Sequence, residues 1–282
     1  MKTILRTGVV LLLLLAATLL PFLPGRHDVL AIPLSTVAQG LGFAALLVVP
    51  VGVLWLVHGL RHRGDTAAAD LVRARYALAA LAVATALALL AAMLTVTQAG
   101  ISAGAAMVVG TLLAAGYFWR LSRRRSFSQP GPDRVTPACC VLAPPLLLGA
   151  QLAIAPTATA FARDRAIANA APLIADIERF RAQHGRYPHT LHSLWEDYDP
   201  LVVGIPRYLY EPHGEACNLF FETPTFEFGA RVIVVWNPRD EQTATSHNRD
   251  LLEFTGADLE RRRGFLAAHA APQPHWKWFV FD

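Results

Sequence analysis

The sequence contains few cysteines, and they form none of the patterns by which cysteine usually stabilises a fold or holds a metal. Cys139 and Cys140 are adjacent at the start of an apolar run, and Cys217 is alone in the C-terminal half. No disulfide can therefore form within that half, and no C-x-x-C spacing indicates a zinc site. The sequence also lacks a G-x-S-x-G turn, so Ser193, Ser246 and Cys217 are candidate nucleophiles without a recognisable set of partners.

Charge is scarce as well, because charged residues make up only 16% of the 282 positions and apolar residues 54%. Such a composition is typical of a polytopic membrane protein. Residues 1–160 hold 12 Lys and Arg against 4 Asp and Glu, whereas residues 161–282 hold 13 against 17. The net charge of +4 therefore comes from the N-terminal part, and the mildly acidic C-terminal part gives no electrostatic support for a nucleic-acid partner.

Five apolar segments are near the roughly 20 residues that cross a bilayer as a helix. We expect an all-α transmembrane domain over residues 1–160, with spans at about 7–23, 34–57, 77–97, 101–119 and 138–160. The first segment follows two basic residues, as in a signal peptide, but no small-x-small cleavage site follows it, so an uncleaved helix is favoured over a cleaved signal.

The spans contain no Asp, Glu, Lys or Arg. Transport normally needs ionisable groups inside the membrane, so a transporter is disfavoured. Three glutamines, Gln39, Gln98 and Gln151, lie in the spans or next to them, and we interpret them as contacts between packed helices. Small residues four positions apart in the fourth span, Ala106, Gly110 and Ala114, favour close helix packing, with a homodimer as the alternative.

Basic residues orient the predicted spans, because short loops rich in Lys and Arg stay in the cytoplasm. Arg26 alone falls on the opposite side. These residues fall on one side: Lys2, Arg6, Arg61, Arg63, Arg73, Arg75, Arg120, Arg123, Arg124, Arg125 and Arg134. We therefore expect a multi-pass protein of a bacterial inner membrane, with a cytoplasmic N-terminus and residues 161–282 in the periplasm.

Residues 161–282 have the pattern of an α+β domain. Apolar positions from Ile167 to Phe180 recur at three- and four-residue spacing, which predicts a helix that Pro172 kinks or restarts and Gly185 ends. A second short helix is expected over 190–198. Alternating apolar residues then predict an antiparallel sheet, and a polar insertion before the last strand predicts one helix over 258–269. The expected strands are 207–211, 218–223, 226–236 and 276–281.

The aromatic residues of the last expected strand, Trp276, Trp278, Phe279 and Phe281, point to both faces of the sheet. Burial of both faces is favoured over a docking surface on one of them.

The segment IERFRAQHGRYPHTLHSL follows an apolar span and leads into the expected sheet. It resembles the N-terminal helix and αβ junction of type IV pilin-like proteins, and most of all the major pseudopilins of type II secretion, in which a helix ends in a similar G-x-Y-P step. The resemblance covers roughly residues 150–236. This chain differs in having four predicted spans before that helix, no G-F-T-x-x-E sequence and no acid in the fifth span. The resemblance therefore implies a fixed, membrane-anchored pilin-like domain with a long helix packed on a small antiparallel sheet.

Three histidines, His184, His189 and His192, are close in sequence, and two of them with Glu196 would suit zinc. The helix face expected for His192 and Glu196 is an exposed one, so solvated side chains are the favoured interpretation.

The sequence thus assigns no catalytic, cofactor-binding or metal-binding residue and predicts no enzyme. We expect the periplasmic domain to act through contact with a membrane or periplasmic protein, such as a secretion or pilus-type apparatus. A membrane-anchored enzyme or sensor is the alternative.

Overall fold

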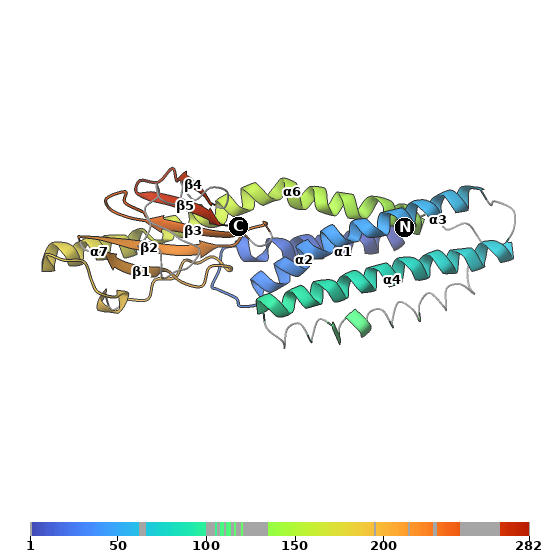
Figure 1. Ribbon diagram of the computed structural model, residues 1–282, viewed down its shortest axis with the longest axis horizontal. Coiled ribbons are helices and arrows are strands. Elements are labelled where there is room, and N and C mark those ends of the chain that lie inside the picture. Colours follow the sequence, from blue (N-terminus) through green and yellow to red (C-terminus); the bar gives the residue numbers. More distant parts are fainter. Residues whose placement is uncertain are drawn as a thin grey trace. The chain divides into compact units, whose positions relative to one another are not determined.

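The computed structural model describes residues 2–61, 66–99, 135–194, 196–213, 215–227, 230–242 and 266–281, with residues 105, 108–109, 111–113, 116 and 120 (Figure 1). The chain forms two compact units. Unit 1 comprises Met1–Leu19 and Pro33–Ile154, and unit 2 comprises Leu20–Ile32 and Ala155–Asp282. One boundary, between Ile154 and Ala155, lies within the helix Val135–Asn169, near the end of its apolar run. The sequence pattern did not predict that Leu20–Ile32 belongs to unit 2.

Unit 1 is built from apolar helices. They are α1 (Lys2–Leu19), α2 (Ala31–Ala45), the short η2 (Leu46–Val48), α3 (Val49–Arg61), α4 (Thr66–Ala99) and the first part of α6 (Val135–Asn169).

Three helical stretches are long and apolar enough to cross a membrane: Thr3–Phe22, Ala31–Arg61 and Val135–His184. They overlap the first, second and fifth predicted spans. The third predicted span lies in α4, whose apolar part, Arg75–Leu90, is shorter. The fourth predicted span and its small residues Ala106, Gly110 and Ala114 lie outside the described residues, apart from a few isolated positions. Five spans are therefore not confirmed, and the chain is a membrane protein with three candidate spans.

In unit 2 the helix restarts where the sequence predicts it. Helix α6 ends at Asn169 and α7 runs over Ala171–His184, with Pro172 in its first turn. A proline there loses no intrahelical hydrogen bond, because the first N–H groups of a helix have no partner within it. Gly185 closes α7 in the left-handed conformation, with φ at 69°, and its N–H donates to the Arg181 carbonyl.

The second predicted helix, over 190–198, is wrong in extent. Only a single 3-10 turn forms there, η3 over Leu191–Leu194. Pro200 favours an extended conformation at Asp199, which limits any helix that approaches it.

The sheet contains β1 (Leu209–His213), β2 (Ala216–Thr223), β3 (Arg231–Trp236), β4 (Leu266–Ala270) and β5 (Trp276–Phe281). All neighbours pair antiparallel, in the order β1-β2-β3-β5-β4. The predicted α+β class is confirmed, although the third predicted strand begins at Arg231 rather than at residue 226.

The helix predicted over 258–269 is wrong over 266–269, which belong to β4; residues 258–265 lie outside the described residues. Strand β4 is rich in alanine, which favours helix. Its backbone nevertheless pairs with β5, with Ala268 opposite Phe279 and His269 stacked on Trp278. Pairing with a neighbouring strand thus outweighs intrinsic helix propensity.

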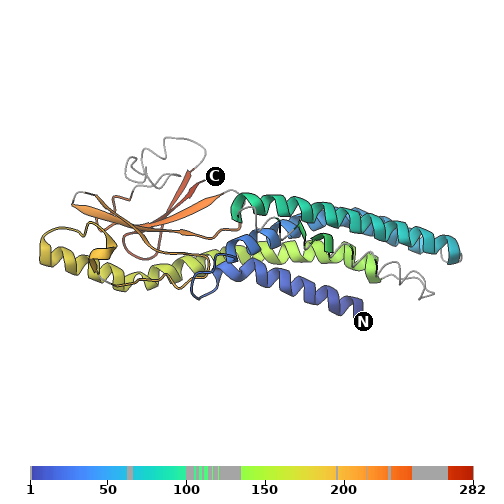
Figure 2. The ribbon, with the colours of Figure 1, turned by 90° about the horizontal axis from the view of Figure 1, so that it is seen from below.

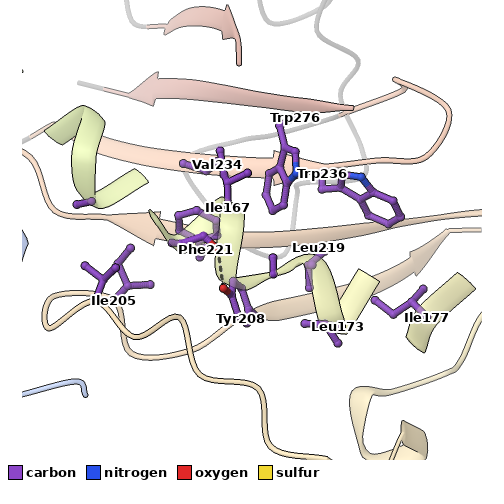
Figure 3. Packing of buried hydrophobic residues seen from close by; sticks show 14 of the residues in the cluster. Ile167, Leu173, Ile177, Ile205, Tyr208, Leu219, Phe221, Val234, Trp236 and Trp276 are labelled. Carbon is purple, nitrogen blue, oxygen red and sulfur yellow. Dashed lines mark hydrogen bonds between the residues drawn. The ribbon is translucent and has the colours of Figure 1, made fainter. Parts of the chain in front are cut away.

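The helix α6–α7 lies along one face of the sheet (Figure 2). Ile167, Leu173 and Ile177 of the helices pack against residues of the central strands (Figure 3). The strand residues in this core are Cys217, Leu219, Phe221, Val234, Trp236 and Trp276. The Tyr208 hydroxyl donates to the Ala166 carbonyl at 2.6 Å, so this buried phenol has a hydrogen-bond partner on α6.

The opposite face of the sheet carries a second buried cluster, formed by Phe220, Ile233, Val235, Phe279 and Phe281. Strand β5 therefore has buried aromatic residues on both faces, which agrees with the core-packing interpretation of Trp276, Phe279 and Phe281. Its position between β3 and β4 explains why both faces are apolar, since an inner strand can be covered on two sides.

Residues 20–28, which follow α1, dock on unit 2 and are called the brace below. Backbone hydrogen bonds join the brace to residues 201–204, with Pro24 bridging Val202, and three of them are Gly25 N to Leu201 O, Val203 N to Leu23 O and Gly204 N to Pro21 O. Phe22 is 2% exposed and stacks on Phe226, with 4.7 Å between ring centroids. The brace thus contributes a side chain to the core of unit 2.

Candidate functional site

Five polar or titratable side chains meet where α7 ends and the sheet begins, at the G-x-Y-P step. We call this group the junction cluster; it consists of Glu178, Arg181, Tyr187, Tyr210 and Cys217. Two positions come from α7, one from the turn after it, and two from the paired strands β1 and β2. The cluster brings together potential acid–base groups from the helix, the turn and the sheet of unit 2.

Tyr187 is the centre of the junction cluster. Its hydroxyl donates to Glu178 Oε1 at 3.0 Å and accepts from Arg181 Nη1 at 2.7 Å. Tyr210 donates to the Pro188 carbonyl at 2.9 Å, which fixes the Tyr-Pro turn to β1. The hydrogen bonds therefore run from helix to turn to strand, and they hold α7 against the sheet.

Burial raises the pKa of three members of the junction cluster, Cys217, Tyr187 and Tyr210. Burial raises the pKa of the Cys217 thiol to about 12. Burial and the hydrogen bond to Glu178 raise the pKa of Tyr187 to about 12, and burial raises the pKa of Tyr210 further. A general base or nucleophile works best with a pKa near the working pH. The cluster therefore has the chemistry of a structural joint, and Cys217 is a small core residue.

The histidines considered for a metal site are not assembled into one. His184 is exposed, stacks on Phe180 at 4.1 Å between ring centroids, and places its Nδ1 3.0 Å from the Phe180 carbonyl. His189, His192 and Glu196 are exposed, and the helix that would align them is only the turn η3. Among the residues that the structure describes, no three His, Cys, Asp or Glu side chains are close enough to hold one metal ion.

The remaining candidate nucleophiles have no catalytic surroundings. Ser193 lies in η3, where its backbone N–H donates to the Thr190 carbonyl, and Ser246 lies outside the described residues.

Unit 1 contains a buried polar cluster of four side chains on three helices: Thr18, Ser35, Gln39 and Gln151. Gln151 Nε2 of α6 donates to Thr18 Oγ1 of α1 at 3.0 Å and to the Ala38 carbonyl of α2 at 3.3 Å. Ser35 donates to the Thr18 carbonyl at 2.6 Å, and Gln39 donates to Ser35 Oγ at 3.0 Å. The bonds of Ser35 and Gln151 join the three helices, which agrees with the interpretation of Gln151 as a packing contact. The bond of Gln39 lies within α2, and the side chain of Gln98 is outside the described set.

Gln151 Oε1 is buried and has no hydrogen-bond partner. It faces Gly42, where an added Cβ would lie only 2.2 Å from it. The Cα–H of Gly42 therefore points at this oxygen, an arrangement that recurs where helices pack closely. Gly52 marks a second close approach, because its Cβ would lie 2.9 Å from Cys140 Cβ.

Sequence reasoning missed both the brace and the joining role of Gly42. No residue pattern predicts the brace, because Phe22 and the residue on which it stacks, Phe226, are far apart in the sequence. No family model, curated protein or solved structure matches the chain, so similarity to known proteins gives no further indication of its function.

Proposed function

We propose that the chain is a multi-pass protein of a bacterial inner membrane that presents its α+β domain in the periplasm for contact with another protein. The observation that carries this proposal is the continuity of α6 and α7. One helical stretch, Val135–His184, begins as a candidate membrane span and ends as the helix that covers the sheet. A domain attached in this way is held at the membrane surface, where it can meet a partner.

The brace supports the proposed orientation. Residues 20–28 pair with residues 201–204, which supports a topology with the loop after α1 and the C-terminal domain on the same side of the membrane. The N-terminus, with Lys2 and Arg6, then lies on the other side, which the Lys and Arg bias identifies as the cytoplasm. In the proposed topology the number of spans between the brace and the domain is even, which holds for three spans in total as well as for five.

A helix that ends in a G-x-Y-P step and lies along a small antiparallel sheet also supports the pilin-like character of the domain. The pairing inside the junction cluster favours a binding module over an enzyme, since Glu178, Arg181 and Tyr187 bond one another and the pKa values of Cys217 and Tyr187 are raised to about 12. We therefore propose a component of a secretion or pilus-type apparatus as the partner class.

Site-specific photo-crosslinking in native membranes tests the partner proposal. A photoreactive residue at Gln183 on α7 or at Ala268 on the edge strand β4 replaces an exposed side chain, and the same residue at the fully buried Val234 is the matched control. We expect discrete adducts with a secretion or pilus component from an exposed position and none from Val234. Adducts only with further copies of this chain, or none, would contradict the proposed partner and direct attention to ligands of the isolated domain.

Topology is tested separately with fusions of alkaline phosphatase, which is active only outside the cytoplasm. Fusion after Asp282 is expected to be active and fusion after residue 64 inactive. An inactive C-terminal fusion would overturn the orientation, whatever the crosslinking shows. Fusion after residue 100 then distinguishes five spans from three.

A further inference from the structure

Large apolar side chains are exposed on unit 2 around the brace. Within it and just after it, Leu23, Val29 and Leu30 are 46%, 75% and 57% exposed, and the facing residue Leu201 is 40% exposed. Phe161 on α6 is 50% exposed. We call these five residues the collar. Exposed apolar residues gathered in this way usually mark an interaction surface.

Hydrogen bonds tie the three segments of the collar together. The Leu201 carbonyl accepts from Gly25 N at 3.0 Å and from Arg165 Nε at 3.4 Å. Val203 N donates to the Leu23 carbonyl at 3.0 Å. The loop after α1, the segment around residue 201 and the start of the charged part of α6 therefore form one surface of unit 2.

Two exposed arginines, Arg26 and Arg165, lie on this surface. Arg165 donates to the Leu201 carbonyl, and Arg26 follows Gly25, which donates to the same carbonyl. The nearby aspartates accept hydrogen bonds from backbone N–H groups: Asp28 Oδ1 accepts from Leu30 N, and Asp199 Oδ1 accepts from Leu201 N. Arginine presents several donors in a plane that matches a phosphate group. The collar thus combines apolar side chains with donors suited to phosphate.

Chain length decides between a lipid surface and a distant protein as the occupant. Only residues 23–30 separate the candidate spans Thr3–Phe22 and Ala31–Arg61. A segment of that length reaches at most roughly 3.5 Å per residue when fully extended, so it must stay close to the membrane surface. Phe161 likewise ends the apolar run of α6, just before Arg163 and Arg165.

We propose that the collar is a lipid-binding surface that lies at the boundary between phospholipid headgroups and acyl chains. Leu23, Val29 and Leu30 enter the acyl region, while Arg26 and Arg165 donate hydrogen bonds to headgroup phosphates. Unit 2 is then held by the bilayer at its brace as well as by the end of α6. Lipid binding by the collar needs no protein partner, so it can be tested independently of the proposed partner contact.

Fluorescence quenching of the full chain in vesicles tests the proposal. The Val29→Cys variant, with Cys139→Ser and Cys140→Ser, is labelled with an environment-sensitive fluorophore and placed in vesicles of phosphatidylcholine and phosphatidylglycerol. Cys217 is buried and stays unlabelled. We expect a nitroxide carried on the lipid near its headgroup to quench the Val29 probe, and iodide in the water to quench it at least about twofold less than at an aqueous position, because interfacial segments are buried by about 5–10 Å.

Gln183→Cys in the same background is the matched control. It is exposed and lies near the far end of α7, 22 residues beyond Phe161, or roughly 30 Å along a helix. Its probe is expected to respond to iodide and not to the lipid nitroxide. A Val29 probe that behaves like the Gln183 probe would overturn the proposal, and a labelled Phe161→Cys variant must give the same answer as Val29.

The arginines are tested by Arg26→Gln with Arg165→Gln in the Val29 reporter. If they bind phosphate, the probe moves, which a change in lipid-nitroxide quenching detects. Unchanged quenching would remove the phosphate contacts from the proposal and leave the apolar contact alone.

Discussion

At the scale of single residues, Gly42 is a position in unit 1 where added volume would meet a buried side chain, that of Gln151. A methyl group there meets Gln151 Oε1, whereas a Cβ at Gly40, two residues earlier in α2, meets nothing within 4 Å. We expect Gly42→Ala to destabilise the helix packing by about 1–3 kcal/mol, as overpacking does. Gly40→Ala is expected to be neutral or to stabilise α2 by about 0.5 kcal/mol, because glycine disfavours helix.

Unfolding of the detergent-solubilised chain, followed by the loss of helix signal, measures both variants. The double variant Gly42→Ala with Gln151→Ala separates the clash from other effects, because it removes the oxygen that the methyl group meets. Recovery of at least part of the lost stability is expected. Equal stability of Gly42→Ala and Gly40→Ala would show that Gln151 does not limit the approach of the helices.

The raised pKa values of the junction cluster predict a loss of stability in alkali. Cys217 and Tyr187 have folded pKa values of about 12, against ordinary values of 9.0 and 10.0. The unfolded chain therefore releases these protons first as pH rises, so the free energy of unfolding is full below about pH 9 and falls from there toward pH 12. Melting temperatures of the full chain between pH 8 and 11 are expected to decline.

Removing a titrating group should flatten this decline. Tyr187→Phe and Cys217→Ala are expected to melt lower at pH 8, because they lose contacts, yet to lose less stability between pH 8 and 11. If each variant kept the slope of the parent chain, the alkaline loss would have to come from groups outside the junction cluster.

At the scale of elements, the end of α7 depends on the backbone conformation of Gly185. Its φ of 69° is one that residues with a side chain rarely adopt, and no neighbouring atom lies within 4 Å of an added Cβ. The cost of substitution is therefore conformational and not steric. Gly185→Ala is expected to lower the free energy of unfolding by about 1–2 kcal/mol, and Gly185→Asn by less, since asparagine tolerates this conformation better. Chemical denaturation followed by tryptophan fluorescence compares the two, and equal losses would contradict the conformational argument.

The sequence predicted well those elements that are determined by residues within the element or directly next to it. Pro172 and Gly185 mark the start and end of α7, and alternating apolar residues mark β2 and β5. A helix was predicted over 258–269, part of which forms β4, because the pairing of β4 with β5 is not visible in the local sequence. The brace was missed for the same reason: Phe22 and Phe226 are two hundred residues apart, and only the folded chain brings them together.

The candidate site shows the same limit. The G-x-Y-P step pointed to the right junction, but the hydrogen bonds of Tyr187 and Tyr210 depend on the tertiary fold. The three histidines, which are neighbours in sequence, are exposed and separate because the expected helix is only a single turn. Proximity along the chain suggested a metal site only as the alternative to solvated side chains, and the described histidines form no such group.

At the scale of the whole molecule, unit 2 is a discontinuous domain, and its stability should depend on the brace. Phe22 is almost fully buried, and Gly204 has no room for a side chain because Pro21 atoms lie 2.7 Å from its Cβ position.

A fragment of residues 161–282 alone exposes this part of the core. Adding residues 20–32 through a flexible linker should restore it. We expect the fused fragment to be more stable by about 3–5 kcal/mol, the range for losing a buried Phe. Urea denaturation measures the difference, and the control is the same fusion carrying Phe22→Ala, which should behave like the bare fragment. Equal stability of all three would show that the brace docks on unit 2 without supporting it, and the discontinuous domain would then reduce to residues 155–282 with a loop resting on their surface.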